Sequence, residues 1–593
     1  MSNSLRIAII IPFYLYERFI SRFMTHICRE GEIVPSEEIK KKKISRREAL
    51  STAAKVATGV IVAGVVAGVG GYFAGSITAP TKTVTETKTV TERVTVTAGA
   101  PATTTVVTAP TTVVTAPAKP PYEGVKLTIC GDAGHNQMPF YWEKDHIAEI
   151  LGVELNIVGV PFGELVDKIM TDFSTGAGEY DIVVFPPFAG GDFYGGGYLV
   201  NIDPYIEKGK TDPEHWDVNW NDIIPTFREL YCSYGGKRYA VTWDGDHYQC
   251  YFRRDLLLDP KINEDFKNKY GYKITDVIKS GGESKLRYDK EWLDIAKFFT
   301  QAYNPDSPIK YGTSELAGRG TNQWHWNSRF GSAGGIYFDD DMNPLINKEP
   351  GVRALQNFVD VIKYCPPGVL KFGYDEHKDA FLLGDAAIIV QWPDIPKKGQ
   401  DPTQSKIVDK IGYTLVPGFE VGGVLNQRGN LAFGRVLAIS KFSKNPEAAY
   451  RVIQYLSGPA SWWATKWISD PRTGLDMFRY YHAEHPELWK KRWESDPELA
   501  GISWNALPEY LQSAKINIEH GFPEPTIPGT PELYDALTIR ISAALAGEMD
   551  PKKALDEAAA EWNKIIDRIG RDYLKKAWAA LKAGWKEVGL LKE

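Results

Sequence analysis

The sequence has few of the residues and motifs that build metal, redox and nucleotide sites. Among its 593 residues there are 5 Cys and 10 His, without a Cys-x-x-Cys pair or a His-Glu-x-x-His segment. These absences argue against zinc sites and zinc hydrolases. The sequence also lacks a Gly-x-x-x-x-Gly-Lys-Ser/Thr loop and a Gly-x-Ser-x-Gly elbow, which argues against a P-loop and an α/β-hydrolase nucleophile. We therefore expect no cofactor, no metal ion and no catalytic residue.

An excess of positive charge is missing from most of the chain. Residues 1–79 carry 11 basic and 6 acidic side chains, whereas residues 80–593 carry 58 and 69. Because Lys and Arg contacts with phosphate supply most of the affinity for nucleic acids, the acidic part of the chain is not expected to bind them. Hydrophobic residues make up 43% of the sequence and charged residues 24%, which is typical of a globular protein with a core.

A long apolar run occurs once, at residues 56–75, which contain no charged side chain. About 20 such residues are enough to cross a membrane as a helix. Lys and Arg residues precede the run, including the twin-arginine-like pair Arg46-Arg47, so the N-terminus is expected inside the cell. We predict a cytoplasmic basic segment at 1–55 and a transmembrane signal or anchor at 56–77. A retained anchor is favoured over a cleaved signal, which would yield a secreted protein.

Residues 78–121 differ from the rest of the chain in composition. They are rich in Thr, Val, Pro and Ala without helical periodicity, which indicates an extended stalk. No Cys comes directly after the apolar run to carry a bacterial type of lipid anchor. Anchor, stalk and body together are typical of an archaeal surface protein, with the body outside the cell.

Four cysteines fall in the predicted body, residues 122–593. They are Cys130, Cys232, Cys250 and Cys365. Cys232 and Cys250 flank a predicted hairpin, so we predict a disulfide between them.

The body begins with alternating strand and helix patterns. Short apolar runs at 125–130, 153–158 and 181–185 predict buried strands, and the segments between them have helical periodicity. This alternation indicates an α/β fold with a parallel sheet. Helices are also predicted after the caps Asn445-Pro446 and Asp550-Pro551. Ligands of parallel sheets bind beyond the carboxyl ends of the strands.

Aromatic residues make up 12% of the sequence, and several polar loops combine them with carboxylates. Sugars favour such loops, because their C–H faces stack on rings and their hydroxyls donate to carboxylates. The candidate ligand-binding residues in these loops are Trp243, Asp244, Asp246, Trp324, Trp326, Trp392, Asp394 and Trp463. The alternative is a place in the core, which stays open for Trp324 and Trp326; for Trp392 and Asp394 the end of a predicted strand favours the site.

Ordered segments of the body resemble extracellular solute-binding proteins of ABC transporters, and most closely family 1, the maltose- and oligosaccharide-binding type. The segments that carry the resemblance are YDIVV (180–184), GYLVNID (197–203), KRYAV (237–241), YFRRDL (251–256), FLLGDAA (381–387), AISK (438–441), NPEAA (445–449) and ALAGE (544–548). Each is weak alone, but they follow the family order over about 122–567. Residues 470–530 fall outside what can be aligned.

The resemblance implies an α/β, two-lobed periplasmic-binding-protein (type II) fold, with the lobes interleaved along residues 122–593 and joined by a hinge. It implies ligand contacts by Asp246, Trp324, and Trp392 or Asp394, by Asp132 after the first strand, and by Phe188 or Asp192 after the third. It also implies a carbohydrate ligand captured outside the cell and delivered to ABC permease subunits, by a body expected to be monomeric and not an enzyme.

Two other interpretations remain at this point. The same fold could bind a polyamine or a peptide, since the candidate loops are rich in acids and aromatic rings. A surface-anchored glycoside hydrolase is the less favoured alternative, because carboxylates are plentiful although no pair stands out.

Overall fold

The computed structural model describes residues 119–431, 434–458, 466–499 and 501–591. The predicted basic segment, the predicted membrane span at 56–77 and nearly all of the predicted stalk lie outside these residues. Among the residues that the structure describes, no helix is both long and apolar enough to cross a membrane.

The first sheet has the strand order β2-β1-β3-β14-β6. Its strands are β1 (Val125–Asp132), β2 (Val153–Val160), β3 (Ile182–Phe185), β6 (Ala240–Asp244) and β14 (Arg435–Ile439). β1 is parallel to both β2 and β3, while β14 runs antiparallel to β3 and β6. The helices α3 (Met138–Leu151) and α4 (Phe162–Thr175) connect the parallel strands. The predicted alternation of strand and helix is thus confirmed.

The apolar periodicity of α4 explains how it covers the first sheet. Leu165, Ile169 and Phe173 recur at helical spacing, and all three are buried. β3 is buried along its whole length, as expected for a short central strand with elements on both sides. We call this sheet and its flanking elements the first lobe.

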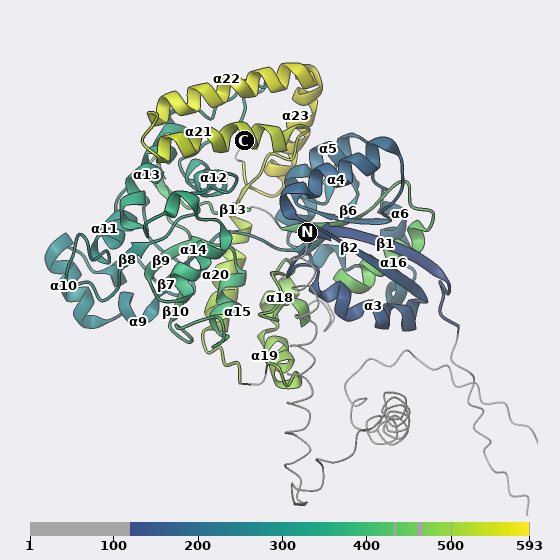
Figure 1. Cartoon of the computed structure of the whole chain (residues 1–593), viewed down its shortest axis with the longest axis horizontal. Coiled ribbons are helices and arrows are strands. Elements are labelled where there is room, and N and C mark those ends of the chain that lie inside the picture. Colours follow the sequence, from purple (N-terminus) through teal and green to yellow (C-terminus); the bar gives the residue numbers. More distant parts are fainter. Residues whose placement is uncertain (1–118, 432–433, 459–465, 500, 592–593) are drawn as a thin grey trace, which may run out of the picture. The chain divides into compact units, whose positions relative to one another are not determined.

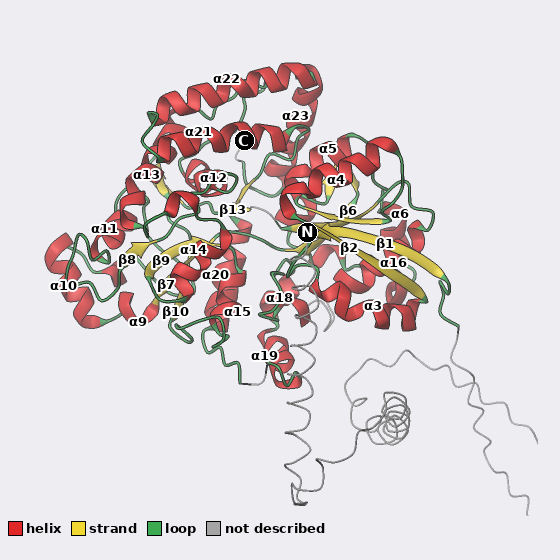
Figure 2. Cartoon of the chain, viewed as in Figure 1, coloured by secondary structure: helices red, strands yellow, loops and turns green. Residues whose placement is uncertain are grey.

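The second sheet has the order β10-β7-β9-β8. Its strands are β7 (Gln249–Arg253), β8 (Tyr311–Thr313), β9 (Ala386–Gln391) and β10 (Ile411–Thr414). β7 is antiparallel to β9 and β10, whereas β8 and β9 are parallel. We call this sheet and its helices the second lobe; Figure 2 shows the strands of both sheets in yellow and the surrounding helices in red.

The chain enters the second sheet directly after β6, because residues 245–248 join β6 to β7. It returns to the first sheet between β10 and β14. Along this return, β11 (Phe419–Val421) pairs with β12 (Val424–Asn426), and β13 (Asn430–Leu431) pairs with the later strand β15 (Phe522–Pro523).

The predicted disulfide between Cys232 and Cys250 is wrong. Cys250 lies on β7 in the second sheet, whereas the Cys232 sulfur is 3.3 Å from the Thr242 hydroxyl on β6 in the first sheet. The four cysteines of the described residues are free thiols, and all of them are buried.

Three long helices follow β15 and pack on both lobes (Figure 1): α21 (Thr530–Leu545), α22 (Pro551–Ile569) and α23 (Arg571–Glu587). α21 lies against α12 (Asn322–Ser332) and α13 (Glu349–Val361), and it also contacts residues 187–189 that follow β3. The predicted helix starts are confirmed: α22 follows Asp550, whose side chain accepts from the Lys552 and Lys553 amides, and α16 (Pro446–Ser457) follows Asn445.

The remaining described helices of six or more residues complete the two lobes. They are α5 (Gly190–Gly195), α6 (Asp203–Gly209), α8 (Pro225–Leu230), α10 (Pro260–Tyr270), α11 (Glu291–Phe298), α14 (Tyr374–Leu382), α15 (Asp394–Gly399), α19 (Pro486–Ser495) and α20 (Leu507–Glu519).

Candidate functional site

The connection between β6 and β7 places two carboxylates where the chain passes from one sheet to the other. Asp244 ends β6 and Asp246 follows it two residues later. Their exposed fractions are only 1% and 8%. A third carboxylate, that of Asp476, joins them: ligand oxygens of the three groups all lie within 4.8 Å of one another. We call these three residues the aspartate cluster.

Backbone hydrogen bonds hold the aspartate cluster together. The Asp476 amide donates to Oδ1 of Asp244 at 2.9 Å, and the Gly245 amide donates to the Asp476 carbonyl at 3.2 Å. Burial raises the pKa of Asp476 to about 7, and burial together with the neighbouring carboxylates raises the pKa of Asp244 and Asp246 well above the usual range. The three groups are close enough to share protons or to ligate one cation.

Asp132, at the carboxyl end of β1, forms a buried ion pair with Arg435 at the start of β14. Nε and Nη2 of Arg435 donate to the two carboxylate oxygens at 2.8 and 2.7 Å. Burial opposes the charge of Asp132, but the guanidinium outweighs it and lowers the pKa of this carboxyl. Both Asp132 oxygens therefore already accept hydrogen bonds, and this side of the site presents an ion pair.

The second lobe contributes the first turn of α15. The Asp394 carboxylate accepts from the Tyr374 hydroxyl and from the Lys398 ammonium. Burial disfavours its charge, yet the ammonium lowers the pKa of Asp394. The Lys397 ammonium lies 3.4 Å from the Asp476 carboxylate, so the two lobes meet at the aspartate cluster.

Aromatic rings adjoin these charges. Trp392, directly after β9, has its ring centroid 5.2 Å from Tyr248, 5.6 Å from Trp324 and 6.0 Å from Tyr374. Its exposed fraction is 6%. Trp324 lies on α12 and donates from Nε1 to Glu524 at 2.9 Å. We call these four residues, Trp392, Tyr248, Trp324 and Tyr374, the aromatic wall.

Two predicted site residues pack with helices. Trp243 is stacked on Phe140 of α3 at 5.0 Å and donates to the Asn136 carbonyl. Trp326 is stacked on Phe330 at 4.5 Å and donates to the Gly351 carbonyl in α13. Of the two roles that the sequence left open for Trp326, these contacts favour the core.

Phe188 and Asp192 lie beside the C-terminal helices. The Phe188 ring is 6.2 Å from that of Tyr534 on α21, and Asp192 accepts from the Gly529 amide at 3.0 Å. Burial raises the pKa of Asp192. Trp463 lies outside the described residues.

Sequence reasoning missed Asp476, Arg435, Lys397 and Lys398. Asp476 belongs to the segment 470–530 that could not be aligned, and no local motif marks it. Lys397 and Lys398 follow Asp394 by three and four residues, a spacing that is typical of one helix. The sequence gives no indication that the two lysines face the first lobe.

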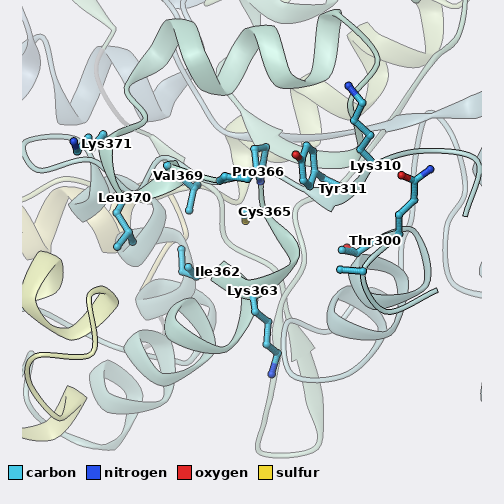
Figure 3. Close-up of a pocket in the computed structure, with 14 residues that line it drawn as sticks. Thr300, Lys310, Tyr311, Ile362, Lys363, Cys365, Pro366, Val369, Leu370 and Lys371 are labelled. Atoms are coloured by element: carbon cyan, nitrogen blue, oxygen red, sulfur yellow. The ribbon is translucent and has the colours of Figure 1, made fainter. Parts of the chain in front are cut away.

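A cavity of about 750 Å³ on the second lobe (Figure 3) has no residue of the aspartate cluster in its lining. It lies between residues 300–311 and 362–371, with three Lys at its lining and the buried thiol of Cys365. None of the predicted site residues lines it.

Comparison with known proteins agrees with the two-lobed architecture. A mannitol-binding protein of Pseudomonas aeruginosa is 23% identical over 422 residues, 68% of this chain and 85% of its own length. A probable amino-acid ABC transporter periplasmic-binding protein of Sinorhizobium fredii is 21% identical over 462 residues, 77% of this chain and 92% of its own.

Among solved structures, a ribitol complex of an ABC transporter solute-binding protein from Agrobacterium radiobacter has a TM-score of 0.59 and 22% identity, covering 75% of this chain and 100% of its own. A maltose-bound protein of T. maritima has a TM-score of 0.57 and 21% identity, covering 74% of this chain and 100% of its own. These likenesses show a two-lobed α/β periplasmic-binding-protein fold. Because residues 146–461 match the family directly, the chain belongs to the bacterial extracellular solute-binding protein family.

Proposed function

We propose that this protein captures a sugar or polyol between its two lobes and delivers it to the permease of an ABC importer. The observation that carries the proposal is the convergence of buried carboxylates and aromatic rings from both lobes at the β6–β7 connection. Asp244 and Asp246 come from that connection, whereas Asp394 and Trp392 come from the second lobe.

The chemistry of these groups suits a polyhydroxylated ligand. A carboxyl group accepts hydrogen bonds when it is ionised and also donates one when it is protonated, so in either form it pairs with hydroxyl groups. Aromatic rings cover the apolar C–H faces of the same molecule. A ligand selects the closed form only through contacts that it makes with both lobes, and here the acceptors are divided between them.

Relatives support this ligand class. A mannitol-binding protein and structures with ribitol and with maltose are all similar to this chain. These ligands share adjacent hydroxyl groups, which a cluster of carboxylates recognises. We expect binding and release without chemical change of the ligand.

A cationic ligand such as a polyamine is the second candidate, because buried carboxyl groups outnumber buried cations at the site. The buried carboxyl groups of the site are those of Asp132, Asp244, Asp246, Asp394 and Asp476, and its buried cations are Arg435, Lys397 and Lys398. Burial lowers the pKa of His135 to about 4, so this nearby residue adds no positive charge at neutral pH. An ammonium group would pair with the clustered carboxyls and favour their ionised form; the relative described as an amino-acid transporter protein favours a nitrogen-containing ligand as well.

For its location, we propose that residues 56–77 anchor the protein in the membrane and residues 78–121 hold a monomeric body outside the cell. The family is extracellular, and the apolar run with its basic flank supports the orientation.

Isothermal titration calorimetry of the full chain in detergent tests the function. Mannitol, ribitol, maltose and longer maltooligosaccharides are the sugar and polyol probes, with spermidine and a peptide mixture as alternatives. Saturable binding of one sugar or polyol, with unchanged ligand recovered by chromatography, supports the proposal. Binding of spermidine alone would show that the ligand is a polyamine and not a sugar or polyol. Hydrolysis of an oligosaccharide would show that the protein is an enzyme and contradict a function in binding alone.

A further inference from the structure

A segment beyond the family-matched residues lies across the candidate site. The match ends at residue 461, and residues 466–479, which we call the strap, follow it. The strap contains Asp476 of the aspartate cluster. Its position matters because it touches both lobes.

The strap is fixed to the first lobe by buried hydrogen bonds. Arg479 is fully buried, and its Nη2 donates to the carbonyls of Val218 at 2.7 Å and Ser457 at 2.5 Å. The Ile224 amide donates to the Phe478 carbonyl at 2.9 Å. The contact is close: a Cβ on Gly245 would lie 2.0 Å from the carbonyl oxygen of Met477.

Two buried lysines of α15 fix the strap to the second lobe. The Lys397 ammonium donates to the Leu475 carbonyl and, at 3.4 Å, to that of Ile468. The Lys398 ammonium donates to the Thr473 carbonyl at 3.4 Å. Hydrogen bonds from charged donors are stronger than neutral ones, so the strap joins the lobes at the point where a ligand between them would lie.

Acceptor atoms beside the strap lack donors. Oδ1 of Asn136 is buried without a hydrogen-bond donor among the described residues, and so is Oδ2 of Asp244. Asn136 adjoins the strap directly, because a Cβ on Gly474 would lie 2.2 Å from its Oδ1. Buried polar atoms nearly always have partners, so these acceptors indicate a ligand that supplies donors next to Asp476.

We propose that the strap is a binding element of this protein in addition to the family-matched residues, and that Asp476 is a specificity-determining residue that accepts hydrogen bonds from the ligand. This proposal rests on the proposed ligand-capturing function. The strap holds Asp476 against Asp244 while the lysines of the second lobe bond to the strap, so the third carboxylate is linked to both lobes.

The first test compares Asp476→Asn with wild type in calorimetry against mannitol, ribitol, maltose and spermidine. The amide keeps the size of the side chain but donates where the carboxylate accepts. We expect a selective loss of about tenfold or more for the preferred ligand, the scale of a lost charged hydrogen bond, and a changed order of affinities. Asp572→Asn, at an exposed position on α23, is the control. Unchanged relative affinities in Asp476→Asn would overturn the role of Asp476.

The second test needs no ligand. Gly245→Ala forces the strap away from β6, and Gly163→Ala, whose Cβ would meet nothing within 4 Å, is the matched control. We expect faster hydrogen exchange of the Ile224 and Asp476 amides in Gly245→Ala only. The Ile224 amide donates to the strap, and the Asp476 amide belongs to the strap and donates to Asp244. Equal exchange of these amides in both variants would contradict the claim that the strap is fixed to the first lobe. If wild type bound none of the probes, the proposed function and the ligand role of Asp476 would fail together, while exchange would still decide whether the strap is fixed to the first lobe.

Discussion

Arg435 and Asp132 form a bidentate ion pair that joins the first strand of the body to a strand more than three hundred residues later. β1 and β14 are not neighbours in the first sheet, because β3 lies between them. The pair therefore spans β3 at the edge of the sheet where the candidate site lies. Arg435 also faces the aspartate cluster, whose carboxylates favour its charge.

Removing the guanidinium leaves a buried carboxylate without its partner. We expect Arg435→Met to lower the free energy of unfolding by about 3–5 kcal/mol, the usual cost of breaking a buried ion pair. Urea unfolding followed by circular dichroism measures this change. The double variant Arg435→Met/Asp132→Asn should recover part of the loss because the unpaired charge is gone; a double variant as unstable as the sum of the single variants would contradict this account.

Stability should depend on pH through Asp476. The pKa of this carboxyl is about 7 in the folded chain, against an ordinary value of 3.8. Between those values the folded chain retains a proton that the unfolded chain has lost, so this group stabilises the fold below pH 4 and its contribution falls as pH rises to 7. The slope is at most about 1.4 kcal/mol per pH unit for one proton.

Urea unfolding at pH 5, 6 and 7 measures that slope. Asp476→Asn cannot titrate, so its free energy of unfolding should rise relative to wild type as pH increases. Groups shared by both proteins cancel in the comparison. A constant difference between variant and wild type over this range would show that Asp476 does not titrate there.

Trp392, for which the sequence favoured the site, and Trp326, for which the sequence left both roles open, should respond differently to substitution. Trp392→Leu removes the ring at the centre of the aromatic wall, and we expect at least about a tenfold loss of ligand affinity, the order of a lost aromatic contact. Trp326→Leu affects packing between α12 and α13, so it should lower the melting temperature and leave the affinity of the folded fraction unchanged. Calorimetry with differential scanning fluorimetry separates the two effects; equal loss of affinity would place both rings at the ligand.

Much of the fold could be predicted from local pattern. The first three strands and the helices between them follow from short apolar runs and from residues such as Leu165 and Ile169 at helical spacing. Asp244, Asp246 and Asp394 could be proposed because aromatic and acidic residues alternate near strand ends. These features depend on neighbours in the sequence, which a single sequence contains.

What could not be predicted depends on contacts between distant segments. Asp476 reaches Asp244 across 232 residues, and nothing in its own surroundings predicts that contact. The disulfide prediction failed for the same reason. Cys232 and Cys250 are close in the sequence, but Cys232 lies beside β6 and Cys250 lies on β7, and these two strands belong to different sheets. The roles of Trp243 and Trp326 likewise depended on which helix lies opposite each ring.

The free thiols give a prediction that needs no ligand. Burial raises the pKa of Cys130 and of Cys232 to about 12, and it raises those of Cys250 and Cys365 well above the usual range. Because the thiolate is the reactive form and these sulfurs are shielded from reagents, none of the four should react with iodoacetamide in the native protein. All four should be alkylated after unfolding in guanidinium chloride without a reductant, which peptide mass spectrometry detects residue by residue. Protection of Cys232 and Cys250 that persists until dithiothreitol is added would instead show a disulfide and contradict the separate places of the two thiols, that of Cys232 beside β6 and that of Cys250 on β7.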